Sequence, residues 1–302
     1  MKRNGIKSSW DDRIFDLICS IFLVSFVVIV FYPIYFVLIA SFTEPSIVNN
    51  GSVLLFPKSL FLKGYEMVIK EKDIWISYGN TIIYTVGGTI LGVFVVISAG
   101  YALSRPQLIG RSILMKLLVF TMYFSGGLIP HYLVIRSLGL VNTRALMIIL
   151  GSVSVYNIIV VRSFMTGNIP EELFEAGELD GCGYGKFFFK VVVPLSKAVI
   201  AVMVLYIAVG YWNAYFNAMV YLTDPNKYPL QLRLREILLV ASSLAGDPDL
   251  MASDPEYYNE LRMTSMVMKY SVIVVATVPI LCVYPFVQKY FVKGVMIGSV
   301  KG

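Results

Sequence analysis

The sequence predicts an all-α integral membrane protein with six transmembrane helices. Of its 302 residues, 57% are hydrophobic and only 15% are charged, whereas an average soluble domain has about 25% charged residues. The mean hydropathy is +0.74. Six stretches lack Asp, Glu, Lys and Arg over the roughly 20 residues, or at least about 17, that a spanning helix needs. Their apolar runs do not alternate like the strands of a membrane barrel. A helical bundle is therefore expected, and a cytosolic enzyme is excluded.

The charge-free stretches place the spans and loops in order. The first span is far longer than a signal-peptide core and no A-x-A site follows it, so we expect it to remain as an anchor. The fourth charge-free stretch, between Arg144 and Arg162, is the shortest of the six. One permease domain is expected over residues 1–302, with a cytoplasmic loop at 166–190 and a long extracellular loop at 224–266. The expected spans are residues 14–42, 77–103, 113–135, 143–165, 191–222 and 267–289.

Basic residues predict the orientation, because Lys and Arg are enriched in cytoplasmic loops. With the N-terminus inside, most Lys and Arg residues fall on inner segments. The short segment Ser104–Ser112 carries Arg105 and Arg111 without any acidic residue. Both termini are therefore expected in the cytoplasm.

The spans lack the groups that ion-driven transport or catalysis uses. An ionisable side chain at mid-bilayer costs about 2.5–3.5 kcal/mol and is usually functional where it persists, yet the middles of the six spans have none. Three cysteines and one histidine, His131, exclude a disulfide scaffold and a multi-histidine metal site. The glycine-rich stretch Gly181–Lys186 does not match a phosphate loop. No catalytic residue, metal or cofactor is expected.

Neutral polar and aromatic side chains gather in the third, fourth and fifth spans instead. Aromatic faces and amides suit sugars, which present C–H faces for stacking and hydroxyls for hydrogen bonds. The same residues also fit interfacial belts or hydrogen bonds between helices, and that alternative stays open. In the second span, Gly88 and Gly92 have the spacing of closely packed helices. The candidates for the substrate path are Tyr123, Asn157, Tyr211, Trp212, Asn213, Tyr215 and Asn217.

The cytoplasmic loop predicts a short amphipathic helix over Pro170–Leu179. Proline suits the first helical turn, and Glu171 and Glu172 favour the positive end of the helix dipole. Gly181 stands where a left-handed residue closes a helix.

One edge of this predicted helix is apolar and its other face is acidic. Leu173, Phe174 and Gly177 form the apolar edge, which we expect to be exposed and to dock in a groove of another protein. A helix lying on lipid is the alternative. Such a helix favours basic residues on its polar face, whereas this one carries glutamates.

The same segment resembles the EAA loop of bacterial ABC-importer permeases, with the pattern Glu-Ala-Ala, three residues, Gly, nine residues, Ile-x-Leu-Pro. Glu175, Ala176, Gly181 and Pro194 match it, and Gly177 replaces the second alanine. Other segments resemble the carbohydrate (maltose-type) permeases and their LplC/YtcP-like branch. They are Asn80, Tyr101–Arg105, Ser125–Pro130, Trp212-Asn213, Tyr228–Gln231 and Pro285–Gly294.

The resemblance implies the maltose-type permease fold and ATP-driven import of carbohydrates, specifically oligosaccharides, across the bacterial plasma membrane. It implies a second permease subunit in a heterodimer, two cytosolic ABC ATPase subunits, an extracellular solute-binding lipoprotein, and no nucleic acid. The chain itself is then non-catalytic. The alternatives are a permease for another solute class, a secondary transporter or a membrane scaffold. The implied ATPase-coupling residues are Pro170, Leu173, Phe174, Glu175, Ala176, Gly177, Asp180, Gly181 and Pro194.

Two further segments carry expectations. The outer loop 224–266 is acidic and is expected to face the binding protein. The tail Lys293–Gly302 is expected to be extended or turning, because Gly294 and Gly298 disfavour a helix.

Overall fold

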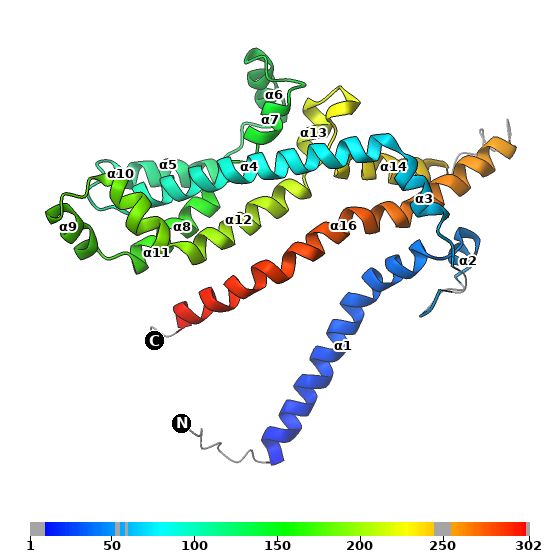
Figure 1. The fold of residues 1–302 in the computed structure, drawn as a ribbon, viewed down its shortest axis with the longest axis horizontal. Helices are drawn as coiled ribbons and strands as arrows, with labels where there is room; N and C mark the ends of the chain where they lie inside the picture. Colours follow the sequence, from blue (N-terminus) through cyan, green and yellow to red (C-terminus); the bar gives the residue numbers. More distant parts are fainter. Residues whose placement is uncertain (1–9, 52–54, 58–59, 245–254, 300–302) are drawn as a thin grey trace. The chain divides into compact units, whose positions relative to one another are not determined.

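A computed structural model shows a helical protein (Figure 1). It describes residues 10–51, 55–57, 60–244 and 255–299, and no strand occurs among them. The all-α class is therefore confirmed. The chain divides into two compact units, residues 1–70 with 237–275, and residues 71–236 with 276–302.

The first unit is built on α1. Its sequence is apolar on every side, as in a membrane span, and its large side chains from Trp10 to Leu38 are mostly exposed. Only its last residues, from Ile39 onward, are buried, where Ile39 and Val48 pack with Tyr270. This unit contains α1 (Trp10–Ser41), α2 (Pro45–Asn49) and α3 (Lys63–Lys70), together with the last part of α14 (Leu230–Leu244) and the first part of α16 (Pro255–Ser299).

The second unit is organised around α4 (Lys72–Ser104), which packs along α12 (Lys197–Trp212) and α8 (Val155–Asn168) (Figure 1). Glycines let the helices approach closely. Gly88 faces the ring of Tyr211 with no room for a Cβ, and a Cβ on Gly92 would lie 3.0 Å from the carbonyl oxygen of Ser152. The predicted close packing of the two glycines is confirmed.

Shorter elements complete the second unit. They connect the three long helices at both of their ends. They are α5 (Arg111–Tyr123), α6 (Leu128–Ser137), α7 (Arg144–Ile149), α9 (Glu171–Leu179), α10 (Tyr184–Phe187), the π-helix η1 (Phe188–Val192), α11 (Val193–Leu195), α13 (Phe216–Tyr221), the 3₁₀ helix η2 (Pro225–Lys227) and the first part of α14 (Leu230–Leu244).

Among the described residues, three helical stretches are long and apolar enough to cross a membrane: α1, α4 and residues 265–282 of α16. Two bent pairs raise this number to five if each pair makes one span. The pair α5 and α6 bends by 114°, and Tyr184–Leu195 bends by 81° from α12. The first bend falls at Phe124–Gly127, where Gly127 has a φ of 89°. The stretch expected as the fourth span holds α7 and α8, and neither helix is among these candidate spans.

The tail differs from its expectation. Helix α16 continues through Gly294 and Gly298 to Ser299. Each glycine costs a helix only about 1 kcal/mol relative to alanine, and here the helix is already propagating from a long apolar stretch. The expectation of an extended or turning chain is wrong for residues 293–299.

Candidate functional site

The predicted cytoplasmic-loop helix is present as α9, Glu171–Leu179, directly after Pro170. Its C-terminal end closes as the sequence predicts. Gly181 has a φ of 69°, its N–H donates to the Glu178 carbonyl (3.0 Å), and the Cys182 N–H donates to the Gly177 carbonyl (2.8 Å). This pair of hydrogen bonds is a Schellman motif, which satisfies carbonyls that a helix end leaves unpaired.

Phe174 does not lie on an exposed edge, which corrects the sequence-based expectation. It is buried, with its ring edge-on to Phe187 (centroids 5.3 Å apart) and stacked on Tyr184 (5.2 Å). The turn after α9 brings α10 back beneath the helix, so the aromatic rings meet there. Leu173 and Leu179 are the exposed apolar side chains, with 40% and 90% of their surface accessible.

The glycine that departs from the EAA pattern also contacts this aromatic cluster. A Cβ on Gly177 would lie 3.0 Å from Cδ2 of Phe187. That is tighter than ordinary van der Waals contact, so alanine would push the phenylalanine ring away. Glycine at 177 thus lets α9 sit directly on α10.

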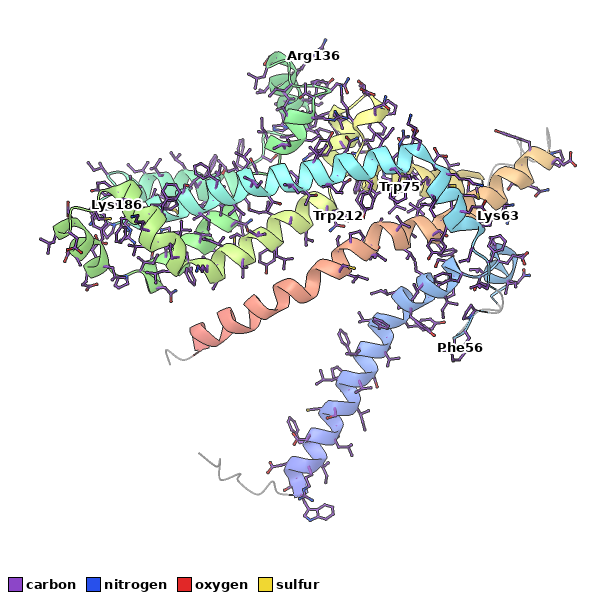
Figure 2. The ribbon with its side chains drawn as sticks, in the orientation of Figure 1. Phe56, Lys63, Trp75, Arg136, Lys186 and Trp212 are labelled. Carbon is purple, nitrogen blue, oxygen red and sulfur yellow. The ribbon has the colours of Figure 1, made fainter. Side chains whose placement is uncertain are left out.

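The outward surface of α9 is acidic. Glu172, Glu175, Glu178 and Asp180 are all exposed, as is Ala176. An open hollow of about 240 Å³ lies at the C-terminal end of the helix, between Phe174, Glu178 and the turn 181–184. Lys186 marks the same end of the second unit in Figure 2. Pro194 is exposed on α11, after the π-helix, and lies outside this surface.

A second hollow, of about 260 Å³, lies between α8 and α12. It brings together three candidates for the substrate path, Asn157, Tyr211 and Asn217, and adds Tyr206. Tyr206 is one helical turn before Gly210, so the helical spacing on α12 places it on the same face. None of the described residues that line the hollow is acidic or basic.

Tyr211 also has a structural role in the packing of the helices. Its hydroxyl donates a hydrogen bond to the carbonyl of Ile148 at the end of α7, and its ring packs on Gly88. The helix contact and the hollow therefore share one side chain.

The other candidates for the substrate path lie elsewhere. Trp212, labelled in Figure 2, is buried, and its Nε1 donates to the Ala276 carbonyl (3.1 Å). Asn213 donates to the carbonyl of Val209 on its own helix (2.9 Å). Tyr215 lies under the guanidinium of Arg235, 5.3 Å from its ring centroid. Tyr123 ends α5 with 87% of its surface exposed.

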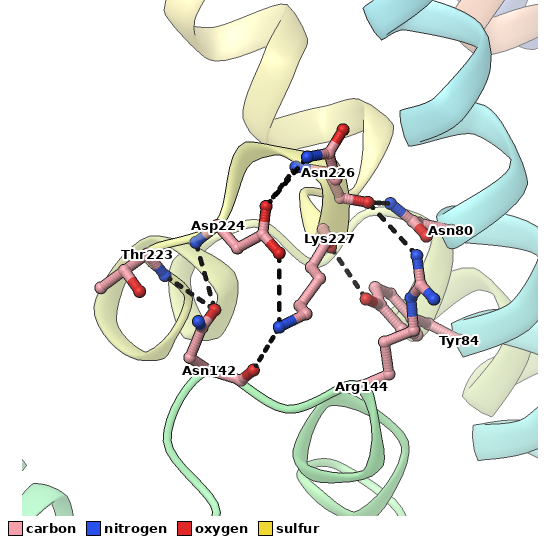
Figure 3. A network of polar contacts seen from close by, with 8 residues as sticks. All are labelled: Asn80, Tyr84, Asn142, Arg144, Thr223, Asp224, Asn226 and Lys227. Atoms are coloured by element: carbon pink, nitrogen blue, oxygen red, sulfur yellow. Dashed lines mark hydrogen bonds and ion pairs between the residues drawn. The ribbon is translucent and has the colours of Figure 1, made fainter.

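A polar network that the sequence did not predict holds the loop 223–228 to α4 (Figure 3). Asn80 Nδ2 donates to the carbonyls of Asn226 (2.7 Å) and Tyr228 (3.1 Å). The hydroxyl of Tyr84 donates to the Lys227 carbonyl (2.8 Å). Asn80 is separated from its partners by 146 and 148 positions, so no local pattern could reveal this contact.

The same loop is held from its other side by Asn142, which has a φ of 59°. The side-chain oxygen of Asn142 accepts from the N–H groups of Thr223 (3.2 Å) and Asp224 (3.1 Å). Lys227 donates to the Asn142 carbonyl (2.9 Å). The backbone N–H of Asn226, with help from Lys227, lowers the pKa of the Asp224 carboxyl.

The remaining sequence candidates add no site. His131 is exposed, and its Nδ1 lies 2.6 Å from the hydroxyl of Tyr221. Over the ranges that the structure covers, no three His, Cys, Asp or Glu side chains are grouped as metal ligands. Asp247, Asp249 and Asp254 of the acidic outer loop lie outside the described residues.

The chain is similar over nearly its whole length to known transport proteins. It is 41% identical over 96% of its length to the polygalacturonan/rhamnogalacturonan transport system permease protein YtcP of Bacillus subtilis, and covers 99% of that protein. It is 38% identical over 96% of its length to Protein LplC of the same organism, covering 96% of it. It is 25% identical over 90% of its length to the arabinooligosaccharides transport system permease protein AraQ of Halalkalibacterium halodurans, covering 91%.

A solved structure agrees with these relatives. It is the crystal structure of a bacterial ABC transporter involved in the import of the acidic polysaccharide alginate, with a TM-score of 0.83 and 32% identity. The match covers 95% of this chain and all of the other. No family model matches the sequence.

These similarities decide the class of the protein. The relatives are transport permeases, so this chain is a membrane transport subunit and not an enzyme. A permease of this kind works with a partner permease, an ATPase and a solute-binding protein. The chain belongs to the ABC-importer permeases of the carbohydrate (maltose-type) family, in the branch of YtcP and LplC.

Proposed function

We propose that α9 is the coupling helix of this permease and that it seats in a groove of a cytosolic ATPase. The observation that carries the proposal is the exposed acidic surface of α9, with Glu175 at its centre and Leu173 beside it. Glutamates at an exposed helix favour a basic groove, because complementary charges steer and orient the encounter. Phe174 faces inward, so its part is to hold α9 on α10 rather than to touch the ATPase.

The proposed assembly follows the resemblance. The chain pairs with a second permease as a heterodimer in the bacterial plasma membrane, above two ATPases, and receives ligand from an extracellular lipoprotein. Both its termini are cytoplasmic. The chain crosses the membrane six times, with α7 and α8 together forming the fourth crossing, as one permease domain. Three apolar helices and two bent apolar pairs support this topology.

The hollow between α8 and α12 is proposed as this chain's share of the substrate path. Asn157, Tyr206, Tyr211 and Asn217 supply neutral hydrogen-bonding groups and aromatic surface. Its volume of about 260 Å³ lies below the roughly 300–1,000 Å³ of complete small-molecule pockets. A second permease would complete such a site.

The ligand is proposed to be an acidic oligosaccharide. The names of YtcP and of the alginate importer refer to uronate-containing polysaccharides, and the hollow has no carboxylate to repel such a ligand. Uptake of oligogalacturonate and of arabino-oligosaccharide by vesicles containing the assembled importer tests the class. Uptake of only the neutral sugar would contradict the acidic class while leaving the importer function in place.

Co-purification tests the coupling helix. The permease pair and the ATPase are purified together from wild type and from the Glu175→Lys and Gly181→Asp variants. We expect both variants to keep the permease pair and lose the ATPase, the first by reversing a charge and the second by straining a left-handed turn.

Gly183→Asp is the matched control, since Gly183 has an ordinary φ of −65° and a Cβ at this position would have no neighbour within 4 Å. It adds the same charge two residues away without straining the backbone. Equal retention of the ATPase by wild type and both test variants would place the docking site elsewhere.

A further inference from the structure

The first residue of α9 is held by two side chains from the end of α4. Nη1 of Arg105 lies 3.3 Å from Oε2 of Glu171, and Nε2 of Gln107 donates to Oε1 of the same carboxylate. Both oxygens of Glu171 thus have partners, and both partners follow α4 directly in the chain. We call Arg105, Gln107 and Glu171 the latch.

Arg105 is placed as a fixed group. Only 7% of the residue is exposed, and its guanidinium carbon lies 4.9 Å from the ring centroid of Tyr101, one turn earlier on α4. An arginine stacked on an aromatic ring gains a cation–π interaction and loses side-chain freedom. The position of Glu171 is therefore defined relative to α4 and not only to its own helix.

The opposite partner is more accessible. The side chain of Glu171 has 29% of its surface exposed, against 9% for that of Arg105. A pair with one buried cation depends on its carboxylate, because removing the partner leaves a charge in a poorly solvated place. Nε of Arg105 is itself buried and has no hydrogen-bond partner among the described residues, which makes the contact to Glu171 the main compensation.

The latch is a second connection between α9 and the long helices. The first is the chain itself, since only Ile169 and Pro170 separate α8 from α9. Helix α8 is also tied to the end of α4, where Nε of Arg162 donates to the Leu103 carbonyl (3.0 Å). Without the latch, no side-chain ion pair or hydrogen bond among the described residues would join the first turn of α9 to the end of α4.

We propose that Arg105 is a positioning residue, which through Glu171 carries the displacement of α9 to α4. This inference rests on the proposed coupling function of α9. Docking and transmission are then separate properties of one helix. The outward acidic surface holds the ATPase, and the inward carboxylate of Glu171 makes α4 follow the motion.

The test uses the complete importer in vesicles and measures both ATP hydrolysis and ligand uptake. Glu171→Gln and Arg105→Gln are expected to retain the ATPase during purification. Their uptake per ATP hydrolysed is expected to fall at least tenfold. Arg111→Gln is the control, because it removes a positive charge from the same short segment, outside the latch.

Reversal of the pair sharpens the test. Arg105→Glu with Glu171→Arg is expected to recover part of the uptake per ATP that either single reversal loses. Glu171→Gln keeps side-chain shape, so it reads out the charge even if a variant at the buried Arg105 yields no folded permease.

Three results would overturn the inference. Wild-type uptake per ATP in both Glu171→Gln and Arg105→Gln would show that the latch transmits nothing. Loss of the ATPase from these variants would make the latch part of the docking surface. If Glu175→Lys retained the ATPase as well as wild type does, α9 would not be the docking helix. The proposed coupling function and this inference would then fail together.

Discussion

The two ends of α4 hold their neighbouring segments by different chemistry. Near its start, the neutral side chains Asn80 and Tyr84 donate to backbone carbonyls of the loop 223–228. Just past its end, the charged Arg105 meets the side chain of Glu171. The first contact grips the main chain, whereas the second depends on one ionised group on each side.

This difference indicates which of the two contacts depends on charge. The hydrogen bonds from Asn80 and Tyr84 do not depend on an ionised group, and breaking them leaves polar groups of largely buried side chains without partners, so they favour a fixed loop. An ion pair is weakened by salt and lost when either charge is removed. We interpret the start of α4 as an anchor and its end as a contact that holds α9 only while both charges are present.

A change in the middle of α4 is expected to destabilise the protein more than a change near either end. Gly88→Leu is expected to be the most damaging change, since a side chain there must displace the ring of Tyr211. Overpacking of this kind costs typically 1–3 kcal/mol and occasionally more. Thermal unfolding of the detergent-purified permease measures it.

Gly79→Ala is the control for that change. Gly79 lies on the same helix with nothing within 4 Å of a Cβ, so alanine is expected to be neutral or stabilising by about 0.5–1 kcal/mol. Equal melting temperatures for Gly88→Leu and wild type would show that the helix middle is not tightly packed.

The anchor is tested by Asn80→Ala. Asn80 is 2% exposed and donates hydrogen bonds to two carbonyls. The substitution is therefore expected to lower the free energy of unfolding by about 1–3 kcal/mol. Asn226→Ala is the matched control, because it keeps the accepting carbonyl and removes only a side-chain bond to Asp224. A smaller loss for Asn80→Ala than for Asn226→Ala would reverse the assignment of the anchor.

The contact between Arg105 and Glu171 at the end of α4 is tested by hydrogen exchange in α9. Glu171→Gln removes a charge and keeps an acceptor. Protection of the amides of α9 is expected to fall by about 1–3 kcal/mol, because the buried Arg105 loses its charged partner. Raising the salt concentration should shift wild type toward the variant. Unchanged exchange under both conditions would make the two ends alike.

The smallest effect is expected from acid at the anchor. The pKa of Asp224 is lowered by the Asn226 N–H and by Lys227, so its stabilisation is fully present above the unfolded pKa of about 3.9. It is lost as the pH falls through the folded value. Melting temperatures of wild type and Asp224→Asn should therefore keep a constant difference from pH 8 to pH 5. A difference that shrinks within that window would contradict the lowered pKa.

Local patterns were enough to predict the helix after Pro170 and the close packing at the middle of α4. The helix α9 and the left-handed residue that ends it were predicted from Pro170, the glutamates and Gly181, because helix caps and turns depend on neighbouring residues. The spacing of Gly88 and Gly92 likewise predicts a close helix contact.

Other features depend on contacts that sequence spacing does not reveal. Phe174 was expected on an exposed edge because its helix is short and amphipathic. Its burial follows from the turn that returns α10 beneath α9. The bonds of Asn80 and the pairing of Arg105 with Glu171 join residues far apart in the chain. The sharp bend at Phe124–Gly127 divides a stretch that hydropathy reads as continuous.

The hydrogen bond from Tyr211 to Ile148 has a consequence for biogenesis. Helices of a membrane protein insert in sequence and associate afterwards, and α12 follows α4 and α7 in the chain. The last carbonyls of a helix have no partner within that helix, so the Ile148 carbonyl acquires this donor only when α12 arrives. This hydrogen bond can therefore form only after α12 has been inserted and has packed against α7.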